Sequence, residues 1–151
     1  MGESVRKREM LELIKEKFEV SGQEPRQLSP LTLAFIGDSV YGTIIKTMVV
    51  LAGNCPANEL DKKAVRYVKA TTQAKMFDYL TESEALSDEE ADILRRGRNA
   101  KSATTAKNAS VGDYRKATGI EALVGYLYLC GRQERVTELI EKCVKAVDEC
   151  R

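Results

Sequence analysis

SPLTLAFIGDSVYGTIIKTMVVLA, residues 29–52, is the stretch that decides the fold of this chain. It opens with Ser29 and Pro30, a hydroxyl N-cap followed by proline at the first helical position. The apolar run that follows predicts a long helix, which ends at the turn formed by Gly53-Asn54-Cys55-Pro56. Its one carboxylate is Asp38, and a lone acid among apolar residues is unfavourable unless it is paired, neutralised or bound to a metal.

A second apolar stretch, IEALVGYLYL at residues 120–129, carries one acid of its own, Glu121. On a helix, Gly42 lies one turn after Asp38 and Gly125 one turn after Glu121, each on the face of its acid. Glycines there would let two helices cross closely, with both carboxylates directed at one cation. The alternative is that each acid is hydrogen-bonded at a helix contact or reaches the surface at a helix edge.

The rest of the chain also favours helices, and strand signals are weak throughout. Ser87-Asp88-Glu89-Glu90 is a capping-box pattern that predicts a helix start. We expect an all-α fold of about six or seven helices, with residues 1–28 as an N-terminal helix and loop and residues 29–151 as the main domain. We expect further helices over residues 4–19, from Asn58 onward, over residues 88 to about 96, over residues 112–130 and near the C-terminus. Thr71 to Leu80 either continues the helix capped by Asn58 or forms a separate one. The expected apolar faces are Leu11, Ile14 and Phe18 in the first helix, Leu60, Val65 and Val68 opposite the basic face of the Asn58 helix, and Val136, Leu139, Ile140, Cys143, Val144 and Val147 in the last helix.

Composition excludes several kinds of chemistry. The 151 residues include no histidine, so no imidazole base, catalytic triad or imidazole–metal site can form. The four cysteines lack zinc-ligand spacing and are expected to be reduced thiols. No apolar run is expected to reach the length of a membrane span, and the N-terminus does not resemble a signal peptide. By elimination, the candidate catalytic groups are carboxylates, and the metal ions that carboxylates prefer are Mg²⁺ and Mn²⁺.

Charge is concentrated in one segment although the net charge is only +1. Residues 95–116 contain seven basic residues and one acid, a local charge of +6. Ser, Thr and Asn side chains are interleaved with the basic ones, and such donors suit phosphate and ribose oxygens. The segment has almost no aromatic residues, which favours reading of a duplex backbone over base stacking. The alternative is an ordinary solvated face, with arginines at a helix C-terminus.

Four stretches of the sequence resemble one known family. Residues 33–41 resemble the signature helix of the ribonuclease III family, and residues 120–129 resemble its second acidic helix. Residues 95–102 and 114–119 are similar to the Mini-III branch of that family. The resemblance implies an all-helical, homodimeric endonuclease domain over residues 29–151, which cleaves double-stranded RNA with Mg²⁺. It implies that Asp38 and Glu121 are catalytic metal ligands and that Phe35 is an aromatic knob at the dimer interface.

The resemblance carries further expectations. The branch lacks a separate RNA-binding domain and trims precursors of 23S ribosomal RNA in the cytoplasm, helped by a large-subunit ribosomal protein, and the family leaves 5′-phosphate and 3′-hydroxyl ends. Ala34 and Thr118 stand where the family usually has two further metal-site acids, a loss that the branch tolerates. The residues expected to bind RNA are Arg98, Asn99, Lys101, Ser102 and Lys107, extended by Arg66 and Lys69. The competing hypotheses are a non-catalytic helical RNA- or ribosome-binding module and a helical protein–protein adaptor.

Overall fold

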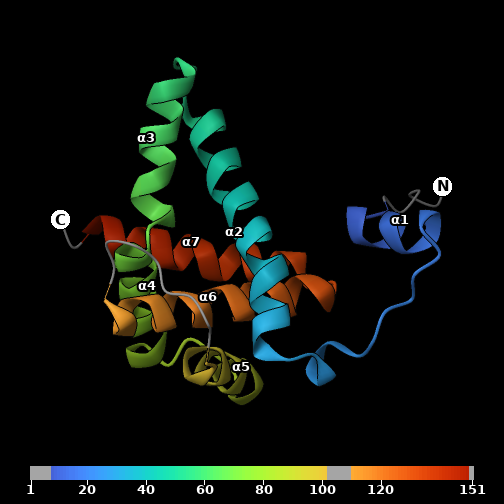
Figure 1. The fold of residues 1–151 in the computed structure, drawn as a ribbon. Coiled ribbons are helices and arrows are strands. Elements are labelled where there is room, and N and C mark those ends of the chain that lie inside the picture. Colours follow the sequence, from blue (N-terminus) through green and yellow to red (C-terminus); the bar gives the residue numbers. More distant parts are fainter. Residues whose placement is uncertain (1–7, 102–109, 150–151) are drawn as a thin grey trace, which may run out of the picture.

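The computed structural model describes residues 8–101 and 110–149, and within them every regular element is helical (Figure 1). The all-α prediction is therefore confirmed for this part of the chain. The α-helices are α1 (Met10–Lys17), α2 (Pro30–Ala52), α3 (Ala57–Val68), α4 (Ala70–Glu82), α5 (Asp88–Asn99), α6 (Val111–Leu129) and α7 (Gln133–Glu149), with a short 3₁₀ turn, η1, at Pro25–Gln27.

Local signals explain where most of these helices begin. The Ser29 hydroxyl accepts a hydrogen bond from the Thr32 amide at 3.2 Å, so the predicted cap of α2 is confirmed. The predicted capping box of α5 is complete, with Ser87 and Glu90 each bonding the other's backbone amide. The predicted Asn58 cap is wrong, because α3 begins directly after Pro56, two residues earlier than a cap at Asn58 would place it; the Asn58 side chain accepts a hydrogen bond from the adjacent Glu59 amide, at 3.0 Å. Thr71 to Leu80 belongs to a separate helix, α4.

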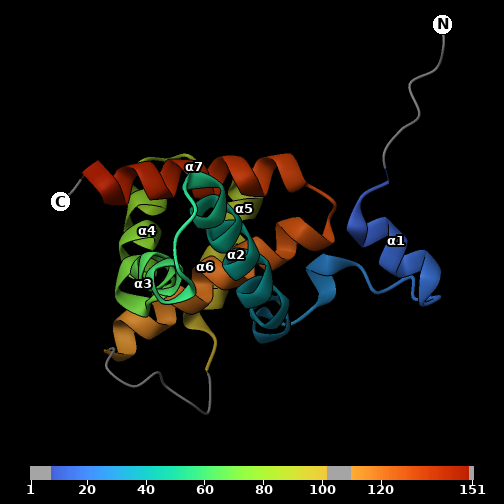
Figure 2. The same cartoon turned by 90° about the horizontal axis from the view of Figure 1, so that it is seen from above.

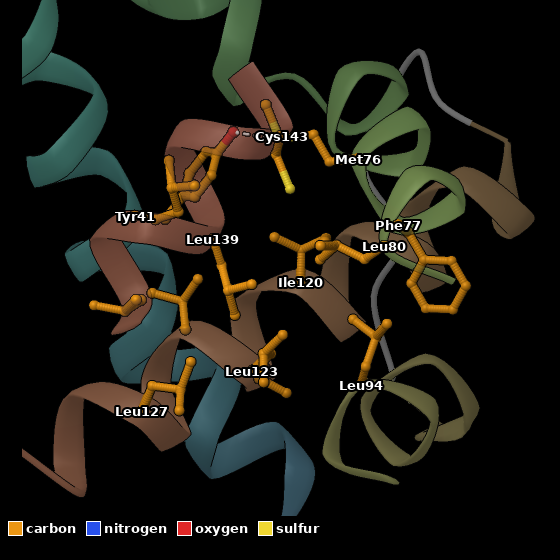
Figure 3. Close-up of a cluster of buried hydrophobic side chains, with 14 of the residues drawn as sticks. Tyr41, Met76, Phe77, Leu80, Leu94, Ile120, Leu123, Leu127, Leu139 and Cys143 are labelled. Atoms are coloured by element: carbon orange, nitrogen blue, oxygen red, sulfur yellow. Dashed lines mark hydrogen bonds between the residues drawn. The ribbon is translucent and has the colours of Figure 1, made fainter. Parts of the chain in front are cut away.

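Helix α6 is the centre of the domain. It packs against α2, α5, α4 and α7, and its most extensive contact is with α2. Figure 3 shows side chains of α2, α4, α6 and α7, including Tyr41, Met76, Ile120 and Leu139, meeting in one apolar core. The inward residues predicted for α7 are confirmed, with Val147 partly buried at the edge. Cys55, Cys130 and Cys143 are free thiols, as expected.

The α2–α3 hairpin and α1 extend from this core (Figures 1 and 2). Both views show α1 at one side of the helical body, and the predicted apolar stripe of that helix is mostly uncovered: Leu11 is buried, but Phe18 is 74% exposed. On α3 the buried residues are Ala64 and Tyr67. Of the expected apolar face, Leu60 and Val68 are partly buried against the core, as predicted, whereas Val65 is 49% exposed.

Helix α2 corrects one further expectation. By length and composition it is apolar enough to cross a membrane, so the prediction that no run reaches that length is wrong. Only 33% of its most apolar window is buried, and core helices of other proteins meet the same criterion. In this structure α2 lies along α6, with Tyr41 and Ile45 in the core.

Candidate active site

Helices α2 and α6 cross at two glycines. A Cβ atom added to Gly37 would lie 1.7 Å from the backbone oxygen of Glu121, and one added to Gly125 would lie 2.0 Å from the backbone oxygen of Leu33. Real side chains never approach so closely, so the two backbones can touch only because both residues are glycine. The crossing is therefore fixed next to both predicted acids, since Gly37 directly precedes Asp38.

The structure corrects which glycine of α2 serves the crossing. Gly125 has the expected role, but a Cβ on Gly42 would meet nothing within 4 Å. The sequence predicted that Gly42, one turn after Asp38, would lie at the contact. In the structure, the two backbones approach most closely at Gly37, immediately before Asp38. Gly42 is therefore not part of the contact that brings the two acids together.

Asp38 and Glu121 meet at this crossing, as predicted, but they differ in burial. Glu121 is half-buried and Asp38 is exposed, so the expectation that both acids are buried is wrong for Asp38. The pKa of Glu121 is raised to about 8, chiefly by burial and also by a hydrogen bond and charge repulsion from Asp38, while a hydrogen bond from Gln73 opposes the rise. The pair therefore holds a proton near neutral pH, and a cation between the acids would relieve the repulsion.

Two polar residues beside the acids were not identified from the sequence as part of the site. Tyr41 is buried one turn after Asp38; its hydroxyl donates to the Tyr67 carbonyl at 2.7 Å, and burial raises its pKa. Gln73 of α4 is only 2% exposed, and its Nε2 donates to the Val68 carbonyl at 2.7 Å. Tyr41 had been noted only as a helical neighbour of Asp38. Nothing in a single sequence distinguishes Gln73 from a surface glutamine.

The donor set fits a divalent cation that keeps much of its water. Two carboxylates converge, and the described residues contain no group of three or more acidic or cysteine side chains that could hold a metal. Ala34 is buried and has no ligand atom, and the Thr118 hydroxyl donates to the Tyr114 carbonyl of its own helix at 3.0 Å. Mg²⁺ is commonly bound through one or two carboxylates, with water and substrate phosphate completing its shell. The orphaned, buried Oε1 of Gln73 offers such a shell a further acceptor.

The predicted RNA-binding residues begin at the C-terminal turn of α5. This turn is seated on α6 by Gly97, whose added Cβ would lie 2.8 Å from the Ala122 Cβ. This helix was expected to end at about residue 96; instead α5 continues through Gly97 to Asn99, and the glycine permits the close contact with α6. Arg98, Asn99 and Lys101 are exposed, whereas Ser102 and Lys107 lie outside the described residues.

Other basic residues have partners within the domain. Arg66 pairs with Asp148 and lies 4.9 Å from the centre of the Tyr67 ring, and Lys69 is exposed between α3 and α4. Lys116 pairs with Asp78 at 2.7 Å. Arg98 and Lys116 line a cleft of about 960 Å³ between α4, α5 and α6, but four acids line it as well. Its mixed charge makes this cleft a poor phosphate site.

Phe35 lies three residues before Asp38 and is 81% exposed, which is unusual for a phenylalanine. Leu31, one turn earlier on α2, is 39% exposed. An aromatic side chain left in solvent beside an acid pair marks this side of α2 as a surface for contact with another molecule.

Comparisons with known proteins agree with this geometry. The Ribonuclease III domain family matches residues 31–132. The chain is 52% identical over 122 residues to the Mini-ribonuclease 3 of Thermoanaerobacter sp. (strain X514), covering 81% of this chain and 84% of the relative. It is 48% identical to that of Staphylococcus aureus, covering 81% and 91% of the two chains. A crystal structure of a protein from Fusobacterium nucleatum aligns with a TM-score of 0.72 and 27% identity, covering 83% of this chain and 98% of that one.

The family match spans both acidic helices, the crossing between them and the turn that carries Arg98. The chain therefore belongs to the ribonuclease III family, in its Mini-ribonuclease 3 branch.

Proposed function

We propose that this protein is an endoribonuclease that hydrolyses phosphodiester bonds in double-stranded RNA, with Mg²⁺ or Mn²⁺ held by Asp38 and Glu121. The observation that carries the proposal is the meeting of these two acids at the α2–α6 crossing, where Asp38 helps to raise the pKa of Glu121. An arrangement of this kind is unfavourable for folding alone, and it becomes favourable when a cation lies between the acids.

The two acids have different tasks in this mechanism. Glu121, half-buried on α6, anchors the ion from inside and gives up its proton when the ion binds. Asp38, exposed on α2, holds the ion at the surface, where the phosphate of a duplex can reach it. The bound ion supplies Lewis-acid stabilisation of the phosphate charge and lowers the pKa of the attacking water. The expected products carry 5′-phosphate and 3′-hydroxyl ends.

Substrate binding is assigned to the exposed residues at the end of α5, Arg98, Asn99 and Lys101, and to Ser102 and Lys107 beyond them. Arg66 and Lys69 extend this surface less directly, because Arg66 already pairs with Asp148. These side chains suit the phosphates and 2′-hydroxyls of an A-form duplex. Phosphate contacts are few, so affinity should be modest and should fall as salt is added.

The active form is proposed to be a homodimer, with the exposed Phe35 packed against the partner and one active site facing each strand of the duplex. We assign residues 29–151 to the catalytic domain and residues 1–28 to an N-terminal extension. The substrate that best fits the Mini-ribonuclease 3 relatives is a 23S ribosomal RNA precursor in the cytoplasm, presented by a large-subunit ribosomal protein. Phe35→Ala should shift the sedimentation profile towards monomer, and an unchanged profile would contradict this interface.

One gel tests the proposal. Duplex RNA is incubated with the protein with and without Mg²⁺, beside the Asp38→Asn variant. The parent should cut only with Mg²⁺, and the variant should still bind RNA but not cut it. Arg98→Glu with Lys101→Glu, made in the non-cutting variant, should weaken RNA binding and flatten its salt dependence. Binding without Mg²⁺-dependent cleavage by the parent would favour the non-catalytic RNA-binding module instead.

A further inference from the structure

Gln73 is a buried side chain in which only one of the two polar atoms has a hydrogen-bond partner. It lies in the first turn of α4 and is 2% exposed. Its Nε2 donates to the Val68 carbonyl at 2.7 Å, but its Oε1 has no hydrogen-bond partner. This is the only buried side-chain polar atom without a partner in the part of the chain that the structure describes. A buried amide oxygen without a donor is unfavourable, so its presence needs a reason.

Capping of α3 explains only half of this side chain. The last carbonyls of α3 accept hydrogen bonds from three side chains: that of Arg66 from the Thr72 hydroxyl at 2.6 Å, that of Tyr67 from the Tyr41 hydroxyl at 2.7 Å and that of Val68 from Gln73. A helix C-terminus needs donors, and a hydroxyl or an amide nitrogen supplies one. The cap therefore accounts for Nε2 and leaves Oε1 unexplained.

The location of Gln73 supplies the missing reason. Helix α4 packs against α6, and a hydrogen bond from Gln73 lowers the pKa of Glu121, one of the two acids at the α2–α6 crossing. The Gln73 amide group is planar and is fixed at one end by Val68, so it can hold the Glu121 carboxylate in one orientation. The orphaned oxygen is part of that same rigid group. It therefore lies beside the proposed cation site and not in an unrelated part of the core.

We propose that Gln73 is a positioning residue of the cation site: Nε2 orients the Glu121 carboxylate, and Oε1 accepts a hydrogen bond from the hydration shell of the divalent ion. This inference rests on the proposed function. With Ala34 and Thr118 offering no carboxylate, the ion keeps more water than a site with four acids would leave it, and that water needs acceptors. Groups in this outer shell orient the ligands and affect metal affinity.

The test measures Mn²⁺ binding to the full chain by electron paramagnetic resonance, without RNA. Gln73→Met keeps the length of the side chain and removes both polar atoms. Thr72→Val is the matched control, because Thr72 is equally buried and caps the neighbouring carbonyl of α3. We expect Gln73→Met to raise the Mn²⁺ dissociation constant by about tenfold or more, and Thr72→Val to leave it unchanged. Both variants should lose some thermal stability.

Kinetics add a second readout. In Gln73→Met, the Mn²⁺ concentration for half-maximal cleavage should rise while the KM for RNA stays the same. Unchanged Mn²⁺ affinity in Gln73→Met, or an equal loss in Thr72→Val, would overturn the positioning role and leave a structural cap. If the parent itself bound no Mn²⁺, the proposed function would fail together with this inference.

A third variant covers the case in which Gln73→Met does not fold. Gln73→Glu keeps acceptor oxygens at the site and adds a third negative charge beside Asp38 and Glu121. Without metal it should melt at a lower temperature than the parent, because the charges repel. Mn²⁺ should then raise its Tm by more than it raises that of the parent. A Tm rise no larger than the parent's would place residue 73 away from the ion and overturn the inference.

Discussion

Glu90 and Glu121 are both withdrawn from solvent against α-helices, yet their surroundings have opposite charge. Glu90 is 3% exposed and receives hydrogen bonds from Arg135 at 2.7 and 2.8 Å and from the Ser87 amide at 2.9 Å, which lower its pKa. Glu121 instead faces Asp38, and its pKa rises to about 8. The difference separates two uses of a buried acid. Glu90 has its counter-ion within the fold, whereas Glu121 is proposed to gain one when it binds a cation from solution.

Arg135 is the counter-ion of Glu90, and it has further partners within the domain. Besides Glu90, it donates to the Ala85 carbonyl at 2.9 Å and pairs with Glu138. The guanidinium therefore joins α7 to the start of α5 and to the segment just before it, while its contact with Glu138 lies within α7. Within residues 8–101 and 110–149, no cation contributes to the pKa of Glu121, for which the hydrogen-bonding neighbours are Asp38 and the neutral amide of Gln73.

The largest expected effect comes from Glu121→Gln. The cleavage rate should fall by about 10²–10³-fold or more, because the variant loses charge stabilisation of the transition state. Stability should not fall with it: the parent acid already carries a proton at neutral pH, so the amide resembles the state that it replaces. The check is a single-turnover cleavage assay beside thermal unfolding in EDTA. A large loss of stability would assign Glu121 to the same class as Glu90.

Glu90→Gln should produce the opposite pattern. Removing one partner of a buried ion pair leaves Arg135 short of its counter-ion, and we expect a loss of about 3 kcal/mol in the free energy of unfolding. This value is at the low end of the usual range because Arg135 keeps Glu138 and the Ala85 carbonyl. Denaturant unfolding measures the loss. The folded fraction should cleave RNA at the parent's rate. A strong loss of turnover in folded protein would contradict the purely structural role assigned to Glu90.

The pH dependence of stability should separate the two acids. Glu121 keeps its proton up to about pH 8 when folded but loses it at its ordinary value of 4.5 when unfolded, so the metal-free protein should lose stability as pH rises between these values. Glu90 has a lowered pKa, so its contribution is complete above 4.5 and is lost as pH falls through its folded value. Melting in EDTA from well below pH 4.5 up to about pH 8 checks both limbs. Glu121→Gln should remove the loss of stability towards pH 8. Glu90→Gln should remove the loss of stability at acid pH.

Metal affinity should follow the same proton. An ion that binds Glu121 must displace its proton below about pH 8, so Mg²⁺ affinity should rise by up to about tenfold per pH unit below that value and level off above it. Isothermal titration with Mg²⁺ at several pH values measures this slope. An affinity independent of pH would mean that the ion does not touch Glu121.

The sequence predicted the local capping box of Glu90 and the long-range meeting of Asp38 with Glu121, but it missed the Arg135 partner of Glu90 and the exposure of Asp38. The Ser87–Glu90 capping box was readable because its two residues lie three apart. The Arg135 partner, 45 residues further on, was not, since many surface arginines look the same in one sequence. The meeting of Asp38 and Glu121 was predicted because acids in apolar helices are rare. The exposure of Asp38 was missed, because an apolar helix such as α2 reads as buried on every side.

The last comparison is between Gly37, which lies at the crossing where the acids meet, and Gly42, which does not. Gly42→Ala has open space around its new Cβ and should gain about 0.5–1 kcal/mol, because alanine favours the helix. Gly37→Ala would place the same methyl group 1.7 Å from the Glu121 backbone oxygen. It should cost roughly 1–3 kcal/mol and move α2 away from α6. The Asp38–Glu121 distance would then grow, the pKa of Glu121 would fall towards its ordinary value, and the alkaline decline in stability would shrink. Denaturant unfolding and the melting profile in EDTA measure both changes in this matched pair of variants. If both behaved alike, the glycine crossing would not be what forces two acids together where the Glu90 site has an arginine.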